Sequence, residues 1–270
     1  MNNNSQNTAK ITLRPAAVAG QFYPADPVEL ELMVKSLLNG VGEIPPPSKA
    51  IIAPHAGLIY SGPIAATAYA SLQSVSEKIM RVVLLGPSHR VYLRGLALSS
   101  VDYYETPLGK IEIDQGACNS VRNLPQVAVA DEAHAQEHSL EIHLPFLQLV
   151  LDHFKLIPIV VGEASPSEVA EVLEILWGGD ETQIIISSDL SHFHDYETAR
   201  QLDLSTSKAI ENLELDSIGS QQACGCMPMR GLLQLAKNKH LNVKTLDLRN
   251  SGDTAGTKNR VVGYGAYAIN

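Results

Sequence analysis

Short apolar runs alternate with amphipathic segments along most of the chain. The runs are rich in β-branched residues and lack the polar alternation of half-exposed strands, so they are typical of strands buried on both faces. Buried strands are predicted at residues 50–53, 81–86, 156–161 and 183–187. Further extended segments are expected at 96–99, 110–114, 243–248 and 261–268.

Segments with helical spacing fill the intervals between these strands. Asp26-Pro27 and Ser165-Pro166 each precede a glutamate at the position that a capping box requires. Helices are expected at residues 27–39, 63–72, 139–151, 196–213, from 166 and from 228. The alternation predicts an α/β fold with one three-layer domain, whose mostly parallel or mixed sheet is covered by helices on both faces.

The composition narrows the range of partners and compartments. Of 270 residues, 45% are hydrophobic, which is sufficient for a single large core. The net charge of -9 has the wrong sign for a nucleic-acid backbone or an anionic membrane surface. The polar start lacks the apolar core of a signal peptide. We therefore expect a cytoplasmic protein with a flexible polar arm at residues 1–12, a single domain at 13–270, and neither nucleic acid nor membrane as partner.

Histidines follow three of the predicted buried strands. His55 and His89 come just after the first two strands, and Asp189 and His192 follow the strand at 183–187. Ligands of open α/β sheets bind at the carboxyl ends of the strands, so these side chains are expected to meet. Two imidazoles with a carboxylate or thiolate suit iron, copper or zinc. The alternative is that each histidine only caps a loop by hydrogen bonding. This interpretation is weaker because three histidines occupy equivalent positions.

Six segments, in order along the chain, resemble the Memo family, whose prokaryotic members are called AmmeMemoRadiSam system protein B. They are RPAAVAGQFYP at 14–24, PHAGLIYSG at 54–62, GPSH at 86–89, EHSLEIHLPFL at 137–147, SSDLSH at 187–192 and ACG at 223–225. The resemblance implies a fold similar to that of the class III, LigB-type extradiol dioxygenases. It also implies metal ligands at His55, His89 and Cys224.

The resemblance further implies the residues that would carry catalysis. In the dioxygenases a histidine acts as acid and base beside the iron, which is bound by two histidines and a glutamate. By position His192 is expected to take the acid/base role, with Asp189 orienting it or holding a water. His138 lies in a segment similar to the Asp-His-Gly stretch of the dioxygenases and is expected to form a wall of the same pocket.

Cys224 stands where the dioxygenases have no thiol. A thiolate is softer than a carboxylate, so it favours copper, zinc or a differently tuned iron, and ring cleavage does not follow from the fold. We expect one transition metal ion, with iron preferred over copper and zinc. Cys224 precedes Gly225 on a tight loop near a helix amino end, which favours the thiolate. Cys118 and Cys226 are expected to be packing residues.

Several functions are compatible with these residues. The first hypothesis is a redox, dioxygenase-like enzyme acting on a small substrate and linked to an AMMECR-type and a radical SAM protein, as the family name implies. The second is a non-catalytic peptide-binding or metal-handling protein that uses the same cleft. A minor alternative is a zinc peptidase, because His134, Glu137 and His138 fit the H-x-x-E-H pattern. That pattern needs one continuous helix, whereas a helix is expected to begin only near His138.

Overall fold

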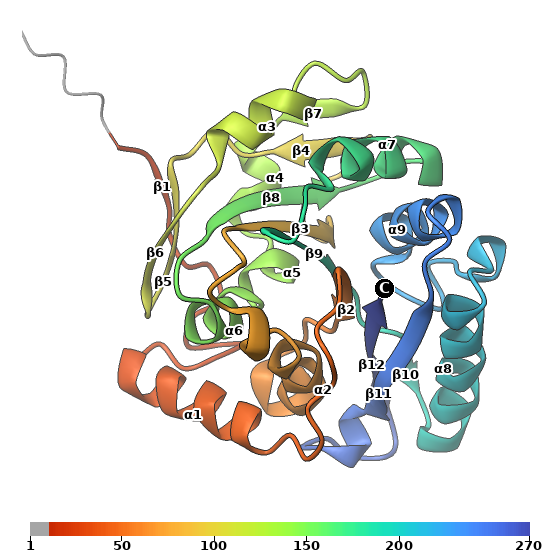
Figure 1. The fold of residues 1–270 in the computed structure, drawn as a ribbon. Helices are drawn as coiled ribbons and strands as arrows, with labels where there is room; N and C mark the ends of the chain where they lie inside the picture. Colours follow the sequence, from red (N-terminus) through yellow and green to blue (C-terminus); the bar gives the residue numbers. More distant parts are fainter. Residues whose placement is uncertain (1–10) are drawn as a thin grey trace, which may run out of the picture.

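The computed structural model describes residues 11–270, so most of the predicted arm at residues 1–12 lies outside the described part. Nine strands form one mixed sheet, seen nearly along its edge in Figure 1. They are β2 (Ala50–Ala53), β3 (Arg81–Pro87), β4 (Leu96–Leu98), β7 (Val127–Val129), β8 (Lys155–Val161), β9 (Thr182–Ser187), β10 (His192–His194), β11 (Val243–Asn250) and β12 (Val261–Ile269).

The four central strands, β2, β9, β3 and β8, are parallel to one another. The sheet continues in the order β10-β12-β2-β9-β3-β8-β4-β7, and β11 pairs with β12. Strand β12 is antiparallel to β2, and β4 is antiparallel to β8. Because the central strands are parallel, β2, β3 and β9 end at the same edge of the sheet, which brings the segments that follow them together.

Helices cover both faces of the sheet, as the sequence pattern predicts (Figure 1). One face carries α1 (Pro27–Asn39), α2 (Leu58–Ala70), α5 (His138–Glu141) and α6 (Leu144–Val150). The other carries α7 (Pro166–Leu176), α8 (Tyr196–Glu211) and α9 (Cys226–Asn238). The shorter α3 (Gln115–Val121) and α4 (Asp131–Ala135) lie in the connections near β4 and β7. The predicted α/β, single-domain fold is confirmed.

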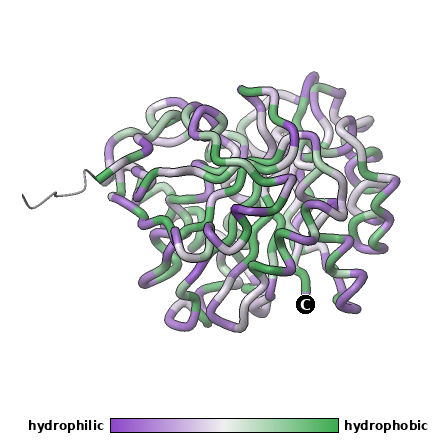
Figure 2. The backbone as a smooth tube through the Cα atoms, turned by 90° about the horizontal axis from the view of Figure 1, so that it is seen from above, coloured by the Kyte–Doolittle hydropathy of each residue, from purple (hydrophilic) through white to green (hydrophobic). Residues whose placement is uncertain are grey.

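Apolar segments concentrate in the interior of the molecule, and polar segments dominate its outline (Figure 2). The central strands are buried along almost their whole length. A separate small sheet is formed by β1 (Leu13–Arg14), β5 (Tyr103–Thr106) and β6 (Gly109–Glu112). Gly109, the first residue of β6 after the turn from β5, has a φ of 123°, which a residue with a Cβ adopts only with strain. Within residues 11–270, no helix has both the length and the apolar character needed to cross a membrane.

Two predicted helices differ from those observed, both at prolines. The expected helix at 139–151 is two helices, α5 and α6, because Pro145 lacks an amide hydrogen and restricts the residue before it. The helix expected from Pro63 begins earlier, at Leu58, and includes the proline. The strands β1, β5, β7 and β10 have two to four residues each and were not predicted by the sequence pattern.

Candidate metal centre

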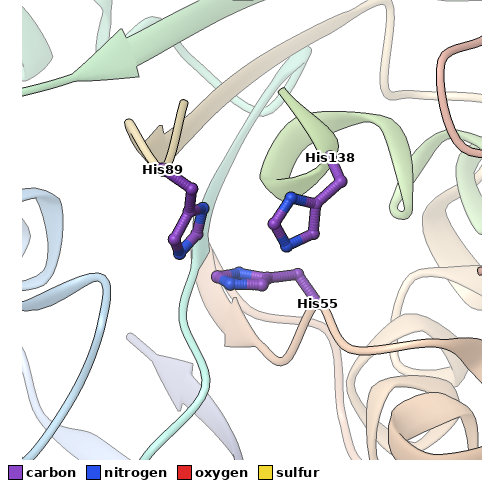
Figure 3. Close-up of side chains that lie close together, drawn as sticks. All are labelled: His55, His89 and His138. Atoms are coloured by element: carbon purple, nitrogen blue, oxygen red, sulfur yellow. The ribbon is translucent and has the colours of Figure 1, made fainter. Parts of the chain in front are cut away.

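Three histidines from separate segments meet at the carboxyl edge of the sheet. His55 follows β2, His89 follows β3, and His138 is the first residue of α5, with all three rings grouped together in Figure 3. The ring centroid of His55 lies 5.1 Å from that of His89 and 5.5 Å from that of His138. The centroids of His89 and His138 are 4.7 Å apart. Their ligand nitrogens all lie within 4.8 Å of one another. His55 is buried and His89 is exposed, so the group opens to solvent on the His89 side.

The tautomer of His55 is fixed by a chain of hydrogen bonds. The Ser187 hydroxyl donates to the carbonyl of Ser139 at 2.6 Å, an atom that can only accept. The Ser187 oxygen therefore accepts from Nδ1 of His55, which lies 2.6 Å away. The proton on Nδ1 leaves a lone pair on Nε2 of His55, the atom that lies 3.3 Å from the sulfur of Cys224. His55 is thus set to bind a metal ion through Nε2.

The tautomer of His89 is fixed in the same way by Glu137. One carboxylate oxygen of Glu137 lies 2.9 Å from Nδ1 of His89, and the other accepts from the His89 backbone amide at 2.6 Å. The Ser139 amide also donates to this carboxylate at 2.9 Å. Burial alone would raise the pKa of Glu137, but these hydrogen bonds and the His89 ring lower it to about 2. The ionised Glu137 accepts the Nδ1 proton and leaves Nε2 of His89 as the ligand atom.

A second group of candidate ligands shares His55 with the first. It consists of His55, Asp189 and Cys224, again with ligand atoms within 4.8 Å of one another. Oδ1 of Asp189 accepts from the His55 amide at 2.7 Å, and Oδ2 lies 4.0 Å from Nε2 of His55. The Asp189 amide donates to the sulfur of Cys224 at 3.3 Å. This group offers one nitrogen, one oxygen and one sulfur, a donor set that transition metal ions accept.

Together the two groups contain every predicted site residue except His192, and His55 belongs to both. The predicted ligand set of His55, His89 and Cys224 takes one member from each group and stays a prediction. His138, expected as a wall of the pocket, lies among the candidate ligands, and so does Asp189. Burial lowers the pKa of His55 well below its usual range, and the neighbouring His89 and His138 lower it further. Burial likewise lowers the pKa of His138 to about 4, so both rings are neutral near pH 7, as ligation requires.

The expected position of Cys224 near a helix amino end is confirmed, but in the chain without a metal ion that position does not make the sulfur a thiolate. Helix α9 begins at Cys226, two residues after Cys224, and the sulfur of Cys224 accepts from the Asp189 amide. Burial raises the pKa of the Cys224 thiol, and the Asp189 carboxylate raises it further. A metal ion bound there would displace the thiol proton. Cys118 and Cys226 are buried in the core, consistent with packing roles.

His192 lies on β10, which pairs with β12 beside the centre. Its Nδ1 is 2.8 Å from the carbonyl oxygen of Leu190, which can only accept, so Nδ1 carries the proton and Nε2 is free to take one. The ring is therefore oriented by Leu190, whereas the predicted orienting residue, Asp189, holds the His55 amide. The next residue, Phe193, has a φ of 64° and an exposed ring.

The zinc-peptidase alternative does not fit the structure. His134 is buried, and its Nδ1 lies 2.6 Å from the hydroxyl of Tyr104 while its Nε2 lies 3.0 Å from the carbonyl of Ala97. Both ring nitrogens are thus used in the core. Helix α4 ends at Ala135 and α5 begins at His138, so the continuous helical face that the pattern needs is absent from this segment.

Ser187 and Glu137 contact candidate ligands but were not predicted as site residues from the sequence. Both lie inside segments that resemble the Memo family, Ser187 two residues before Asp189 and Glu137 just before His138. Their position beside predicted site residues was the available signal. Their role depends on which ring nitrogen each one faces, and spacing along the chain contains no information on that.

Comparisons with known proteins identify the family of this chain and agree with its fold. A family model described as Memo-like protein matches residues 14–268. A MEMO1 family protein of Methanosarcina barkeri is 34% identical over 274 residues, covering 95% of this chain and 100% of that protein. One of Sulfurisphaera tokodaii is 38% identical, covering 93% and 97%. The crystal structure of an uncharacterized Escherichia coli K12 protein has a TM-score of 0.53 at 10% identity, covers 81% of this chain and 98% of its own, and shows similarity of fold alone. The chain belongs to the Memo family.

Proposed function

We propose that this protein is a redox, dioxygenase-like metalloenzyme that binds one transition metal ion, preferably iron, and acts on a small substrate. The observation that carries the proposal is that Ser187 fixes a lone pair on Nε2 of His55, the residue shared by the two groups of candidate ligands. Fixed, neutral imidazoles beside a carboxylate and a thiol form a donor set for iron, copper or zinc. The exposure of His89 gives a substrate access to the centre.

The residues of the chain have separate tasks in this proposal. An iron ion bound at the centre would supply Lewis acidity and electron transfer. Glu137 and Ser187 hold the rings of His89 and His55 with Nε2 toward the centre. His192 accepts a proton from a substrate hydroxyl at Nε2, because its Nδ1 proton is engaged by Leu190.

A metal-handling protein without turnover is the second candidate, and one observation favours it. Five side chains offer candidate ligand atoms at this centre, namely His55, His89, His138, Asp189 and Cys224. If most of them bound the same ion, the coordination sphere would be closed, whereas catalytic sites keep a position open for substrate. Peptide binding and the link to AMMECR-type and radical SAM proteins rest on the family resemblance alone.

Metal content and turnover, measured on matched variants, test the proposal. The protein is purified without oxygen and analysed for metals as wild type, His55→Ala, Cys224→Ser and His192→Ala, with the exposed His153→Gln as control. Near-stoichiometric iron lost in His55→Ala, reduced in Cys224→Ser and kept in the other two supports the centre. Oxygen consumption with small phenolic substrates that is lost only with His192→Ala among the metal-loaded proteins supports the enzyme. Metal binding that is indifferent to His55 overturns the proposal.

A further inference from the structure

The segment at residues 14–23 contacts two of the three segments that supply histidine ligands, those of His55 and His138, although it contributes no ligand to the two groups found in residues 11–270. It belongs to the first stretch that resembles the Memo family, and the proposed function leaves it without a task. Two of its residues, Arg14 and Phe22, make these contacts. Both reach the end of the sheet where the candidate ligands lie.

Arg14 is buried and fixes the backbone before His138. Its Nε donates to the carbonyl of His134 at 3.0 Å, and its Nη2 donates to the carbonyl of Glu137 at 2.7 Å. The guanidinium also lies over the ring of Tyr104, 5.0 Å from its centroid. Arg14 thus holds the backbone near the end of α4, at His134, and at Glu137, the residue just before α5. Glu137 is the residue whose carboxylate orients His89, so a shift of its backbone would reach His89 and His138 together.

Glu141 anchors Arg14 to the rest of the segment. This fully buried carboxylate forms an ion pair with Nη1 of Arg14 and accepts from the hydroxyl of Tyr23. It also accepts from the amides of Ala17 and Val18, at 2.8 and 3.0 Å. A buried ion pair with this many donors is costly to break by removing one partner and fixes the geometry of both segments. Glu141 lies three residues after His138, and neither Glu141 nor Arg14 belongs to a ligand group.

Phe22 connects the same segment to His138 and to the His55 loop. Its ring centroid is 4.7 Å from that of His138, and its carbonyl accepts from the Leu58 amide at 2.8 Å. Leu58 begins α2, three residues after His55. Gly57, between them, packs against the Phe22 backbone, where an added Cβ would lie 3.4 Å from the carbonyl oxygen. One segment therefore contacts the His138 ring and the start of the helix behind His55.

We propose that Arg14, Glu141 and Phe22 are positioning residues that hold the three histidine ligands at the spacing a metal ion requires. The inference rests on the proposed metal centre for its consequence. Supporting residues of metal sites act by limiting the positions that ligands can adopt, and their loss typically weakens metal binding by about 10 to 100-fold. Removal of the contacts of Arg14 should loosen His89 and His138 while the rest of the fold persists.

The test replaces Arg14 by lysine in the full chain. Arg14→Lys keeps the charge beside Glu141 but loses the planar fork that reaches both carbonyls. The matched control is Arg81→Lys, which weakens the ion pair with Asp114 at the start of β3, the end remote from His89. Tyr23→Phe, which removes one hydroxyl from Glu141, is a milder second variant in case Arg14→Lys does not fold. Cobalt(II) is the probe, because its visible absorption reports ligand geometry.

We expect Arg14→Lys to bind cobalt(II) about tenfold more weakly than wild type and with shifted absorption bands. Tyr23→Phe should show the same shift to a smaller extent, and Arg81→Lys should match wild type in both respects. Equal affinity and spectrum in wild type, Arg14→Lys and Tyr23→Phe would overturn the proposal, whatever the loss in thermal stability.

A second readout separates this inference from the metal centre itself. Nitrogen-15 resonances of the imidazole rings, recorded without metal, should move for His89 and His138 in Arg14→Lys while the exposed His153 and His240 stay unchanged. If wild type binds no cobalt(II), the proposed centre fails, but moved resonances would still support the positioning role. Unmoved His89 and His138 resonances would overturn it.

Discussion

Two buried carboxylates flank the candidate ligands, and their surroundings differ. Glu137 accepts from the His89 amide, the His89 ring and the Ser139 amide, and these partners lower its pKa to about 2 despite its burial. Asp189 accepts from the His55 amide, and burial raises its pKa above the usual range. Burial alone therefore does not decide the protonation state of these carboxylates. The number of hydrogen-bond donors to each carboxylate does.

This difference assigns separate roles to the two side chains. The hydrogen-bonding capacity of Glu137 is largely used by the protein, so its carboxylate is suited to hold His89 rather than to bind a metal ion directly. Asp189 keeps an oxygen 4.0 Å from Nε2 of His55 and belongs to a ligand group. Asp189 is accordingly the carboxylate that a metal ion would recruit, and binding would favour its ionised form.

The largest effect is expected from Glu137→Gln. The amide keeps the size of the side chain but replaces one acceptor by a donor that faces the His89 amide or ring. We expect metal affinity to fall by about 10 to 100-fold and the free energy of unfolding to fall by about 1–3 kcal/mol. Titration calorimetry and urea unfolding measure the two. Glu168→Gln, a capping glutamate on α7, serves as control. Unchanged metal affinity would refute the supporting role of Glu137.

Asp189→Asn should have a smaller effect of a different kind. The amide oxygen can still accept from the His55 amide, so the free energy of unfolding should change by less than about 1 kcal/mol. The loss of a negative ligand should weaken metal binding by about tenfold, as expected for one charged donor. Asp203→Asn is the control, because Asp203 is also buried, accepts from the Ser191 amide and lies outside both ligand groups. A large loss of stability with intact metal affinity would reverse the roles assigned to the two carboxylates.

The fold was largely predictable because it depends on local patterns. Apolar runs such as 50–53 and 183–187 can only be buried in the middle of a sheet, and their order placed the ligand-bearing segments at one edge. The predicted helix and strand boundaries are wrong where one local sequence feature is compatible with more than one structure. Proline split one expected helix at Pro145 and was accommodated inside another at Pro63. Short strands such as β10 depend on a partner strand that is far away in sequence.

Which side chains come together was largely predictable from the sequence, whereas their hydrogen bonds and protonation were not. Positions after the strands, together with the resemblance, predicted His55, His89 and Cys224 as ligands, and the structure places them in two groups that share His55. The protonation of Cys224 could not be predicted because it depends on burial and on the distance from Asp189, which are tertiary properties. The same holds for the tautomers of the histidines, which depend on single atoms of distant residues.

His143, a buried histidine outside both ligand groups, shows the effect of burial alone on the pKa of an imidazole. Burial lowers the pKa of His143 to about 3, and its Nδ1 lies 2.8 Å from the Tyr69 hydroxyl. Because the unfolded chain takes up this proton near its ordinary pKa of about 6.5, the contribution of His143 to stability is complete above that pH and is lost as the pH falls toward 3. His143→Leu should make the unfolding free energy less dependent on pH between 6 and 4, by up to about 1.4 kcal/mol per pH unit. Urea unfolding at several pH values measures the slope, and parallel slopes for the two proteins would contradict the assignment.

The smallest effect is expected from Ser187→Ala, which removes a neutral partner of His55 instead of a charged one. Nδ1 of His55 would lose its acceptor, so the ring would no longer be held in the tautomer that offers Nε2. A neutral hydrogen bond contributes about 1 kcal/mol, so metal affinity should fall by about threefold to tenfold. Ser120→Ala, on the exposed side of α3, is the matched control. If Ser187→Ala weakened metal binding more than Glu137→Gln, the neutral hydroxyl rather than the ionised carboxylate would be the main determinant of ligand orientation, and the contrast drawn between charged and neutral support would be wrong.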